Sequence, residues 1–276
     1  METYAECMKA HLAKYKIERI GVLEDGFWSN NGKPYAHILP ERLHRLNILE
    51  SIRREFWQFF ALHASTLALH KDFHHLNSSQ AFAFNLFFPW AGLDCASGPL
   101  LAALKIEPCA VREWTFEFMP EEAEGTVVDL YAELDGGARL LIEVKLTESG
   151  FGGCDPNGTH QKKLLETYSS RLKAKVTEGC LDQSVFFPNY QLFRNVSHLD
   201  IGRGDTLILL VPRANEMTWQ QGHGFCDQRL TQTTQQSVKL VAVEDVLSDL
   251  SHAEELPCRF RGHLDSLCEK YLPITE

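Results

Sequence analysis

Residues 126–146, TVVDLYAELDGGARLLIEVKL, contain the pattern that decides the fold of this chain. Two runs of alternating polar and apolar residues flank the tripeptide DGG at 135–137, which is typical of a short β-hairpin loop because glycine accepts positive φ angles. Partner residues in such a hairpin are equidistant from its centre. With the loop centred on Gly136, Asp129 is therefore predicted to lie opposite Glu143.

The two faces of this hairpin differ in polarity, because side chains along a strand alternate between its faces. One face is wholly apolar and carries Val128, Leu130, Ala132, Leu134, Ala138, Leu140, Ile142, Val144 and Leu146. The other is mostly polar and carries Asp129, Tyr131, Glu133, Arg139, Leu141, Glu143 and Lys145. The apolar face is predicted to join the core. This fixes the register, since a slip of one residue would bury the charges.

The polar face places two carboxylates side by side, with a lysine two residues beyond one of them. Asp129 and Glu143 would repel each other unless a cation lay between them. Mg²⁺ suits such a site because it prefers oxygen ligands and keeps several waters, and Mn²⁺ can take its place. Lys145 is then placed to orient a water or to stabilise charge on a phosphate oxygen. This arrangement predicts metal-assisted hydrolysis of a phosphodiester.

An alternative interpretation is an ordinary solvated strand face, in which Glu133 and Arg139 form a cross-strand ion pair. A Glu-x-Lys tripeptide alone would favour that interpretation, because it is common by chance. The opposed aspartate, the apolar reverse face, a preceding strand and a following polar helix together favour the hydrolytic site.

The rest of the pattern predicts helices before and after a central sheet. Helical periodicity covers 2–16, 40–64 and a nearly all-apolar segment that begins at Asn77 or Ser78 and ends at Pro89. The predicted strands are 111–119, 126–134, 138–146, 206–211 and 238–243. Further helices are predicted at 160–176, 189–198, 243–250 and 261–271.

The composition predicts one soluble, cytosolic domain that does not enter a membrane. The chain has 276 residues, of which 44% are hydrophobic, but no apolar stretch reaches the roughly 18 residues of a membrane helix. Eight cysteines without a CxxC pair are expected to be reduced thiols. The formal net charge of −10 counts against a protein that coats nucleic acid non-specifically, yet an enzyme can confine its positive charge to one cleft.

Several motifs resemble the PD-(D/E)XK nuclease superfamily and, within it, the PGN_0703-like restriction endonucleases. They are NSSQAFAFNLFFPW at 77–90, TFEF at 115–118, IEVKLTESGFG at 142–152 and YQLFRN at 190–195. The resemblance implies an α/β restriction-endonuclease-like core of a helix, a three-stranded antiparallel meander, a helix and a further strand, in a mixed sheet flanked by helices. Within a single domain over 1–276, it implies a helical N-terminal extension (1–76), a nuclease core (77–212) and a C-terminal extension (213–276).

The resemblance also implies residue roles. Asp129 and Glu143 would be metal ligands, the carbonyl of Val144 would be a third ligand, and Lys145 would be the catalytic lysine. Val128 stands where the superfamily's name has proline, a departure that leaves these roles unchanged.

Three further polar residues are candidates for the same site. Glu117 lies on the polar side of its strand and would reach this metal or a second one, or would remain a solvated carboxylate. Gln80 and Glu148 would line the site. For Gln80 the alternative is a buried amide that caps backbone groups.

Five residues are predicted to contact nucleic acid. Lys162, Lys163 and Arg171 belong to the densest basic segment of the chain, which follows the hairpin closely and can supply phosphate contacts. The alternative for this segment is a charged solvent face. Gln191 and Arg194, one helical turn apart, are candidates for touching phosphate or the site, and an ordinary structural hydrogen bond or ion pair is their alternative.

These observations predict a Mg²⁺-dependent DNA endonuclease of the restriction type. DNA is its expected partner, and a homodimer is expected because double-strand cutting uses two active centres. A second hypothesis keeps the fold but assigns nucleic-acid binding or regulation without cleavage. A third is a carboxylate-pair hydrolase acting on sugars, which would need no metal.

Overall fold

The computed structural model describes residues 3–93, 95–121, 124–125 and 127–273. The chain folds into two compact units, residues 1–110 with 243–276, and residues 111–242. No helix in the described part of the chain combines the length and the apolar content needed to cross a membrane. The single-domain organisation stays a prediction. Glu2 and Thr126, the predicted first residues of a helix and a strand, lie outside the described residues.

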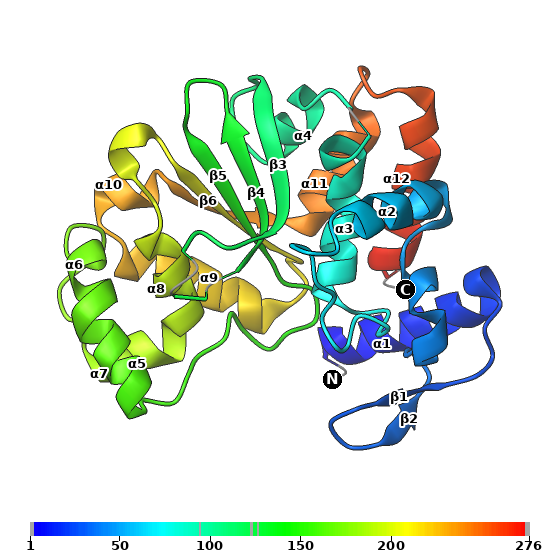
Figure 1. The fold of residues 1–276 in the computed structure, drawn as a ribbon, viewed down its shortest axis with the longest axis horizontal. Coiled ribbons are helices and arrows are strands. Elements are labelled where there is room, and N and C mark those ends of the chain that lie inside the picture. The colour runs from blue at the N-terminus through cyan, green and yellow to red at the C-terminus, as the bar shows by residue number, and fades with distance from the viewer. Residues whose placement is uncertain (1–2, 94, 122–123, 126, 274–276) are drawn as a thin grey trace. The chain divides into compact units, whose positions relative to one another are not determined.

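The first unit is mainly helical (Figure 1). A short antiparallel hairpin in it, which the sequence pattern did not predict, pairs β1 (Gly26–Trp28) with β2 (Lys33–Tyr35). The helical segments are α1 (Tyr4–Tyr15), η1 (Lys16–Ile20), η2 (Glu41–Asn47), α2 (Glu50–Leu62), α3 (Ser79–Ala91), α4 (Gly98–Ala103), α11 (Val243–His252) and α12 (Cys258–Tyr271).

The helix predicted over 40–64 is divided in the structure into the 3₁₀ helix η2 and the α-helix α2. The backbone leaves the helical conformation at Ile48 and Leu49. There the side-chain oxygen of Asn85 accepts a hydrogen bond from the N–H of Leu49 at 2.8 Å. A buried amide thus satisfies a backbone donor that the break would leave unpaired.

Helix α3 continues past Pro89 to Ala91, so the predicted end at Pro89 is wrong. Proline has no N–H, and a proline inside a helix leaves the carbonyl four residues earlier without its usual donor. That carbonyl belongs to Asn85, and the Nε2 of His263 contacts it at 2.8 Å. The imidazole ring therefore compensates for the missing backbone hydrogen bond. The predicted start is confirmed, since the side chain of Ser78 caps the helix by accepting from the N–H of Ala81.

The second unit is built on a five-stranded mixed sheet in the order β3-β4-β5-β6-β7 (Figure 1). The strands are β3 (Val111–Phe118), β4 (Val128–Leu134), β5 (Arg139–Val144), β6 (Thr206–Val211) and β7 (Val238–Ala242). The first three strands are antiparallel, and β6 and β7 run parallel to β5. Glu133 pairs with Arg139 and Leu130 with Ile142, which confirms the predicted register. Leu130 and Ile142, on the predicted core face, are fully buried.

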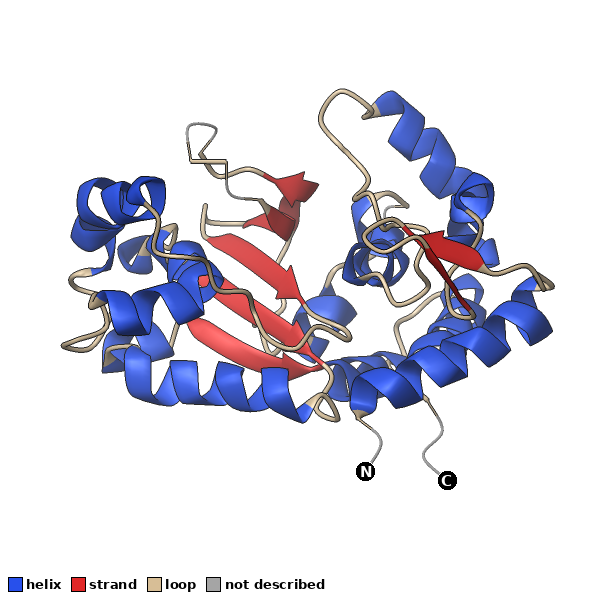
Figure 2. Ribbon diagram, turned by 90° about the horizontal axis from the view of Figure 1, so that it is seen from below, coloured by secondary structure: helices blue, strands red, loops and turns tan. Residues whose placement is uncertain are grey.

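Helices pack beside these strands (Figure 2). The helical segments of this unit are α5 (Gly158–Lys163), η3 (Leu164–Tyr168), α6 (Ser169–Leu172), α7 (Gln183–Phe186), η4 (Phe187–Asn189), α8 (Tyr190–Ser197), η5 (Ile201–Arg203), α9 (Glu216–Arg229) and α10 (Gln232–Gln235). One apolar cluster joins Leu141, Leu207 and Leu209 of the sheet to Tyr168, Phe193 and other buried residues of the helices. A mixed sheet flanked by helices is therefore confirmed.

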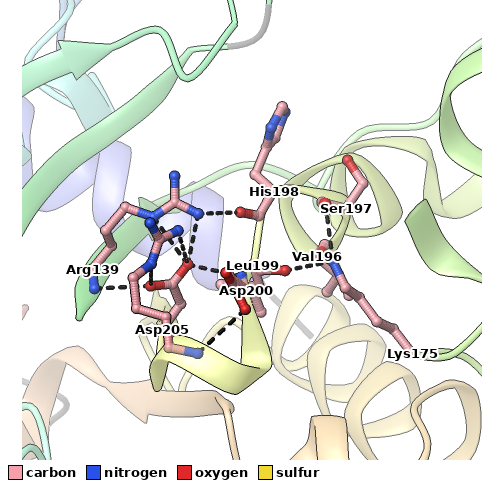
Figure 3. A network of polar contacts seen from close by, with 9 residues as sticks. Arg139, Lys175, Val196, Ser197, His198, Leu199, Asp200 and Asp205 are labelled. Atoms are coloured by element: carbon pink, nitrogen blue, oxygen red, sulfur yellow. Dashed lines mark hydrogen bonds and ion pairs between the residues drawn. The ribbon is translucent and has the colours of Figure 1, made fainter. Parts of the chain in front are cut away.

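A buried ion-pair network connects the start of β5 to the end of α8 (Figure 3). Asp205, which is fully buried, accepts hydrogen bonds from the guanidinium groups of Arg139 and Arg203. Arg139 also donates to the carbonyl of His198 at 2.6 Å. Lys175 donates to three further carbonyls at the end of α8, those of Val196, Ser197 and Leu199. These contacts hold the C-terminal end of α8 in place.

Replacing Asp205 with alanine is expected to lower the free energy of unfolding by about 3–5 kcal/mol, because Arg139 would lose its buried partner. Burial alone would raise the pKa of Asp205, but the hydrogen bonds from Arg203, Arg139 and the backbone lower it overall. The carboxylate therefore contributes stability that is present above the ordinary aspartate pKa and is lost as the pH falls through the lowered value. Urea unfolding at pH 7 and at acidic pH measures both effects. A loss below about 1 kcal/mol would mean that the network behaves like an exposed ion pair.

Candidate active site

Strands β4 and β5 separate at the end where the predicted acidic residues lie. The backbone pairing of the two strands ends at Leu130 and Ile142. Beyond this last pair, the Oδ2 of Asp129 accepts a hydrogen bond from the N–H of Val144 at 2.6 Å. A side-chain carboxylate thus takes the place of a backbone acceptor. As a result, Asp129 lies close to the end of β5, next to Glu143.

Glu143 is held by three side-chain donors and is 2% exposed. The ammonium of Lys145 and the amide of Gln191 both donate to its Oε1 at 2.6 Å. The amide of Asn195 donates to its Oε2 at 3.0 Å. Gln191 and Asn195 lie one turn apart on α8, so this helix presents both amides to one carboxylate. The orientation of Glu143 is therefore fixed from two sides.

The site carries more negative than positive charge. Burial raises the pKa of Asp129 well above its usual value, and the nearby carboxylates of Glu143 and Glu117 raise it further. For Lys145, burial alone would lower the pKa, but Glu143, Asp129 and Glu148 raise it overall. Lys145 therefore stays protonated and compensates only part of the negative charge.

Glu117 and Glu148 contribute to this charge from neighbouring segments. Glu117, in β3, has a φ angle of 50°, a left-handed conformation that costs a residue other than glycine about 1–3 kcal/mol. Such strained positions are enriched at functional sites. Glu148 accepts a hydrogen bond from the N–H of Leu146 through its Oε2 at 2.6 Å. The charge of Glu117 raises the pKa of Asp129 and the charge of Glu148 raises the pKa of Lys145, so both residues lie near the site.

The loop that follows β5 is held by α9, a helix that the sequence pattern did not predict. Asn215 and Thr218 donate to the carbonyl of Glu148 at 2.8 and 2.6 Å. The side-chain oxygen of Gln221 accepts from the N–H of Phe151 at 2.9 Å. These residues fix the backbone that leads away from Lys145. A polar side chain at a helix start, as at Asn215, is the one signal that could have indicated this contact.

The donor set at Asp129 and Glu143 fits a divalent cation with oxygen ligands. Both groups are carboxylates, and the raised pKa of Asp129 means that a positive charge beside it would be favourable. The N–H and C=O of one strand residue point toward the same edge. Because the N–H of Val144 meets Asp129, its carbonyl is directed to the same side and can act as a third oxygen ligand. Mg²⁺ would suit this donor set.

The residues predicted to contact nucleic acid differ in their exposure and in the contacts that they make within the protein. Lys162 is the most exposed, with 70% of its side chain accessible and Glu166 at 3.8 Å. Lys163 donates to the carbonyl of Glu124 at 2.8 Å, and Arg171 pairs with Glu121 at 2.6 Å. Gln191 donates to Glu143, and Arg194 lies over the ring of Tyr190 at 5.7 Å.

Gln80 belongs to the first compact unit, in α3. Its amide nitrogen donates to the carbonyl of Ala68 at 3.0 Å, and its oxygen accepts from the N–H of His70 at 2.8 Å. Both polar atoms of the side chain thus satisfy backbone groups, as the alternative interpretation of a buried amide predicts.

The sheet of the second unit, with a buried glutamate, a partly buried aspartate and a lysine at the divergent ends of adjacent strands, is compatible with a restriction-endonuclease-like fold. Residues 9–272 match the family described as Restriction Endonuclease associating with ARP. The chain belongs to this family. No curated protein and no solved structure gives a significant match. The PD-(D/E)XK superfamily and the narrower group implied by the motifs stay predictions.

Proposed function

We propose that this protein is a Mg²⁺-dependent endonuclease that hydrolyses phosphodiester bonds of DNA. The family is described as a restriction endonuclease, and DNA is the substrate that this description implies. Asp129, Glu143 and the carbonyl of Val144 would hold the ion. When bound, Mg²⁺ would supply a Lewis acid for attack on phosphorus.

The chain's own residues have distinct tasks in this proposal. Gln191 and Asn195 hold the carboxylate of Glu143 in one orientation, which reduces the reorganisation needed during the reaction. Asp129 stays close to Glu143 through its hydrogen bond to Val144. The ammonium of Lys145, which lies against Glu143, would stabilise negative charge on a phosphate oxygen or orient the attacking water.

Basic side chains of the second unit would hold the DNA backbone. We assign this role to Lys162, Lys163, Arg171 and Arg194, with Gln191 contributing from α8. Cutting both strands with one centre per chain would use two copies of the protein, so we include a homodimer in the proposal. The family's description also names association with ARP, which we extend to this chain.

The observation that carries the proposal is the contact set of Glu143 with Lys145, beside Asp129. The test is incubation of supercoiled plasmid with Mg²⁺ or Mn²⁺, with EDTA, and with the Glu143→Gln variant. We expect nicked or linear products that require the metal and Glu143. If the protein binds plasmids from both methylating and non-methylating hosts but cleaves neither, the result would favour a nucleic-acid-binding module without nuclease activity. Activity that persists in EDTA would contradict a metal-dependent mechanism.

Gly152→Ala is expected to impair cleavage about 10- to 100-fold, the range seen when groups that orient a metal ligand are disturbed. Gly152 has a φ angle of 93°, and a Cβ there would lie 3.0 Å from the Oε1 of Gln191. The substitution would strain the loop and displace the amide from Glu143. The matched control is Gly158→Ala, where φ is not in the left-handed region and a Cβ meets nothing within 4 Å. Equal plasmid cleavage rates for the two variants would show that Gln191 is dispensable.

A further inference from the structure

We propose that Glu121, Glu124 and His198 form a second metal site, for Zn²⁺ or a similar transition-metal ion, separate from the carboxylates of the candidate active site. Glu121 and Glu124 belong to the connection between β3 and β4, and His198 caps the C-terminal end of α8. One ligand atom from each of the three residues lies within 4.8 Å of the others. All three belong to the second compact unit.

Burial of the histidine ring supports this site. The side chains of His198 and Glu124 are 5% and 3% exposed, and the Nε2 of His198 lies 2.6 Å from the Oε2 of Glu124. Despite this short distance, the buried Nε2 makes no hydrogen bond among the described residues. The ring also points away from the network around Asp205 (Figure 3), to which His198 contributes only its carbonyl. A buried ring nitrogen that meets a carboxylate without hydrogen-bond geometry lacks its usual partner. The two atoms could share a cation after moving slightly apart, because two ligand atoms of one tetrahedral Zn²⁺ ion lie about 3.3 Å from each other.

Neighbouring side chains hold the two carboxylates in the way that metal ligands are usually held. The hydroxyl of Tyr168 donates to the Oε1 of Glu124. The guanidinium of Arg171 pairs with the Oε2 of Glu121 at 2.6 Å. Ligating carboxylates are commonly hydrogen-bonded by such outer groups, which fix their orientation.

The donor set selects the ion. One imidazole nitrogen and two carboxylate oxygens suit Zn²⁺, which binds both atom types, whereas Mg²⁺ prefers oxygen ligands alone. Arg171 already offsets the charge of Glu121, and a divalent ion would offset that of Glu124. The competing interpretation is a direct ion pair between His198 and Glu124, with no metal.

A metal ion at this position would link Glu121 and Glu124, between β3 and β4, to His198 at the end of α8. This connection leads directly into β4, which carries Asp129. Helix α8 carries Gln191 and Asn195, which hold Glu143. The ion would therefore stabilise the segments on both sides of the candidate active site without taking part in the reaction.

The experiment measures Zn²⁺ binding by isothermal titration and by elemental analysis after dialysis. The full-length protein carries Asp129→Asn and Glu143→Gln, so that the ligands of the proposed Mg²⁺ site are absent. We expect this protein to bind one equivalent of Zn²⁺ and to lose the binding when His198→Gln is added. Tyr168→Phe is expected to weaken the affinity about 10- to 100-fold, as for other groups that orient a ligand. His223→Gln, at a histidine whose side chain is 52% exposed, is the matched control and should bind normally.

Two results would overturn this site. Absence of Zn²⁺ binding would mean that His198 and Glu124 form an ion pair only. Binding that survives His198→Gln would place the ion elsewhere. If His198→Gln does not fold, Glu121→Gln replaces it, because the Glu121 side chain is 41% exposed and its loss should not prevent folding. Failure of Mg²⁺-dependent cleavage in the wild-type protein would test the nuclease proposal alone and leave this result unaffected.

Discussion

Lys145→Met is expected to reduce plasmid cleavage about 100- to 10,000-fold, the range that a positioned proton-transfer or charge-stabilising group contributes. Methionine keeps much of the length of lysine but has no ammonium. The variant would therefore lose the contribution that the ammonium makes to offsetting charge on a phosphate oxygen at the site. The measurement is the rate of nicking of supercoiled DNA at saturating Mg²⁺.

The stability of this variant must be measured with its activity. Removing Lys145 breaks a buried ion pair, which costs up to about 3–5 kcal/mol. The amides of Gln191 and Asn195 remain to satisfy Glu143 and should reduce that cost. Lys33→Met, at an exposed lysine of β2, is the control for loss of one positive charge. If folded Lys145→Met protein cuts DNA at the wild-type rate, Lys145 has no part in the mechanism.

Asp129→Asn is expected to change stability and activity in opposite directions. Folding raises the pKa of Asp129, because the carboxyl is buried and lies near Glu143. Stability therefore falls as the pH rises through the raised folded-state pKa. Asparagine cannot ionise, and its oxygen can still accept from the N–H of Val144. In EDTA at neutral pH, the variant should unfold at a higher temperature than the wild type.

Cleavage by the same variant should fall at least about 100-fold, since the substitution removes a direct metal ligand. Mg²⁺ at a concentration of 100 times its dissociation constant should stabilise the wild type by about 2.7 kcal/mol. The ion should therefore raise the melting temperature of the wild type but not that of Asp129→Asn. Asp227→Asn, whose side chain is 72% exposed, controls for loss of one charge. If Asp129→Asn melts in EDTA at a lower temperature than the wild type, the proposed repulsion between Asp129 and Glu143 is contradicted.

The hairpin and its register followed from sequence because they depend on local interactions. Glycines at 136 and 137 adopt positive φ angles, and the alternation on either side allows only one register with an apolar reverse face. Glu133 therefore pairs with Arg139 as predicted. The same local pattern predicted β6 at Thr206–Val211, because an uninterrupted apolar run is typical of a strand buried on both faces.

The partners of the site residues did not follow from sequence, because they depend on which helix packs on which strand. Nothing local to Asn195 indicates that its amide reaches Glu143, 52 positions away. Arg139 was weighed as a partner of Glu133 but binds Asp205, which comes from the other side of β5. The end predicted at Pro89 was wrong for a similar reason, since the compensating ring of His263 is remote in sequence.

The position of β5 within the sheet has a consequence for how the site can move. Strand β5 has β4 on one side and β6 on the other, but its ladder to β4 ends at Ile142, so Glu143 and Val144 are paired with β6 alone. Opening the body of β5 requires loss of two ladders at once, which makes brief local excursions there rare compared with those of an edge strand such as β3. The end of β5 is held by the ladder to β6 and by the hydrogen bond from the N–H of Val144 to Asp129. Any adjustment to an incoming ligand must therefore come from surrounding loops and side-chain rotations, while the strand itself acts as a rigid base.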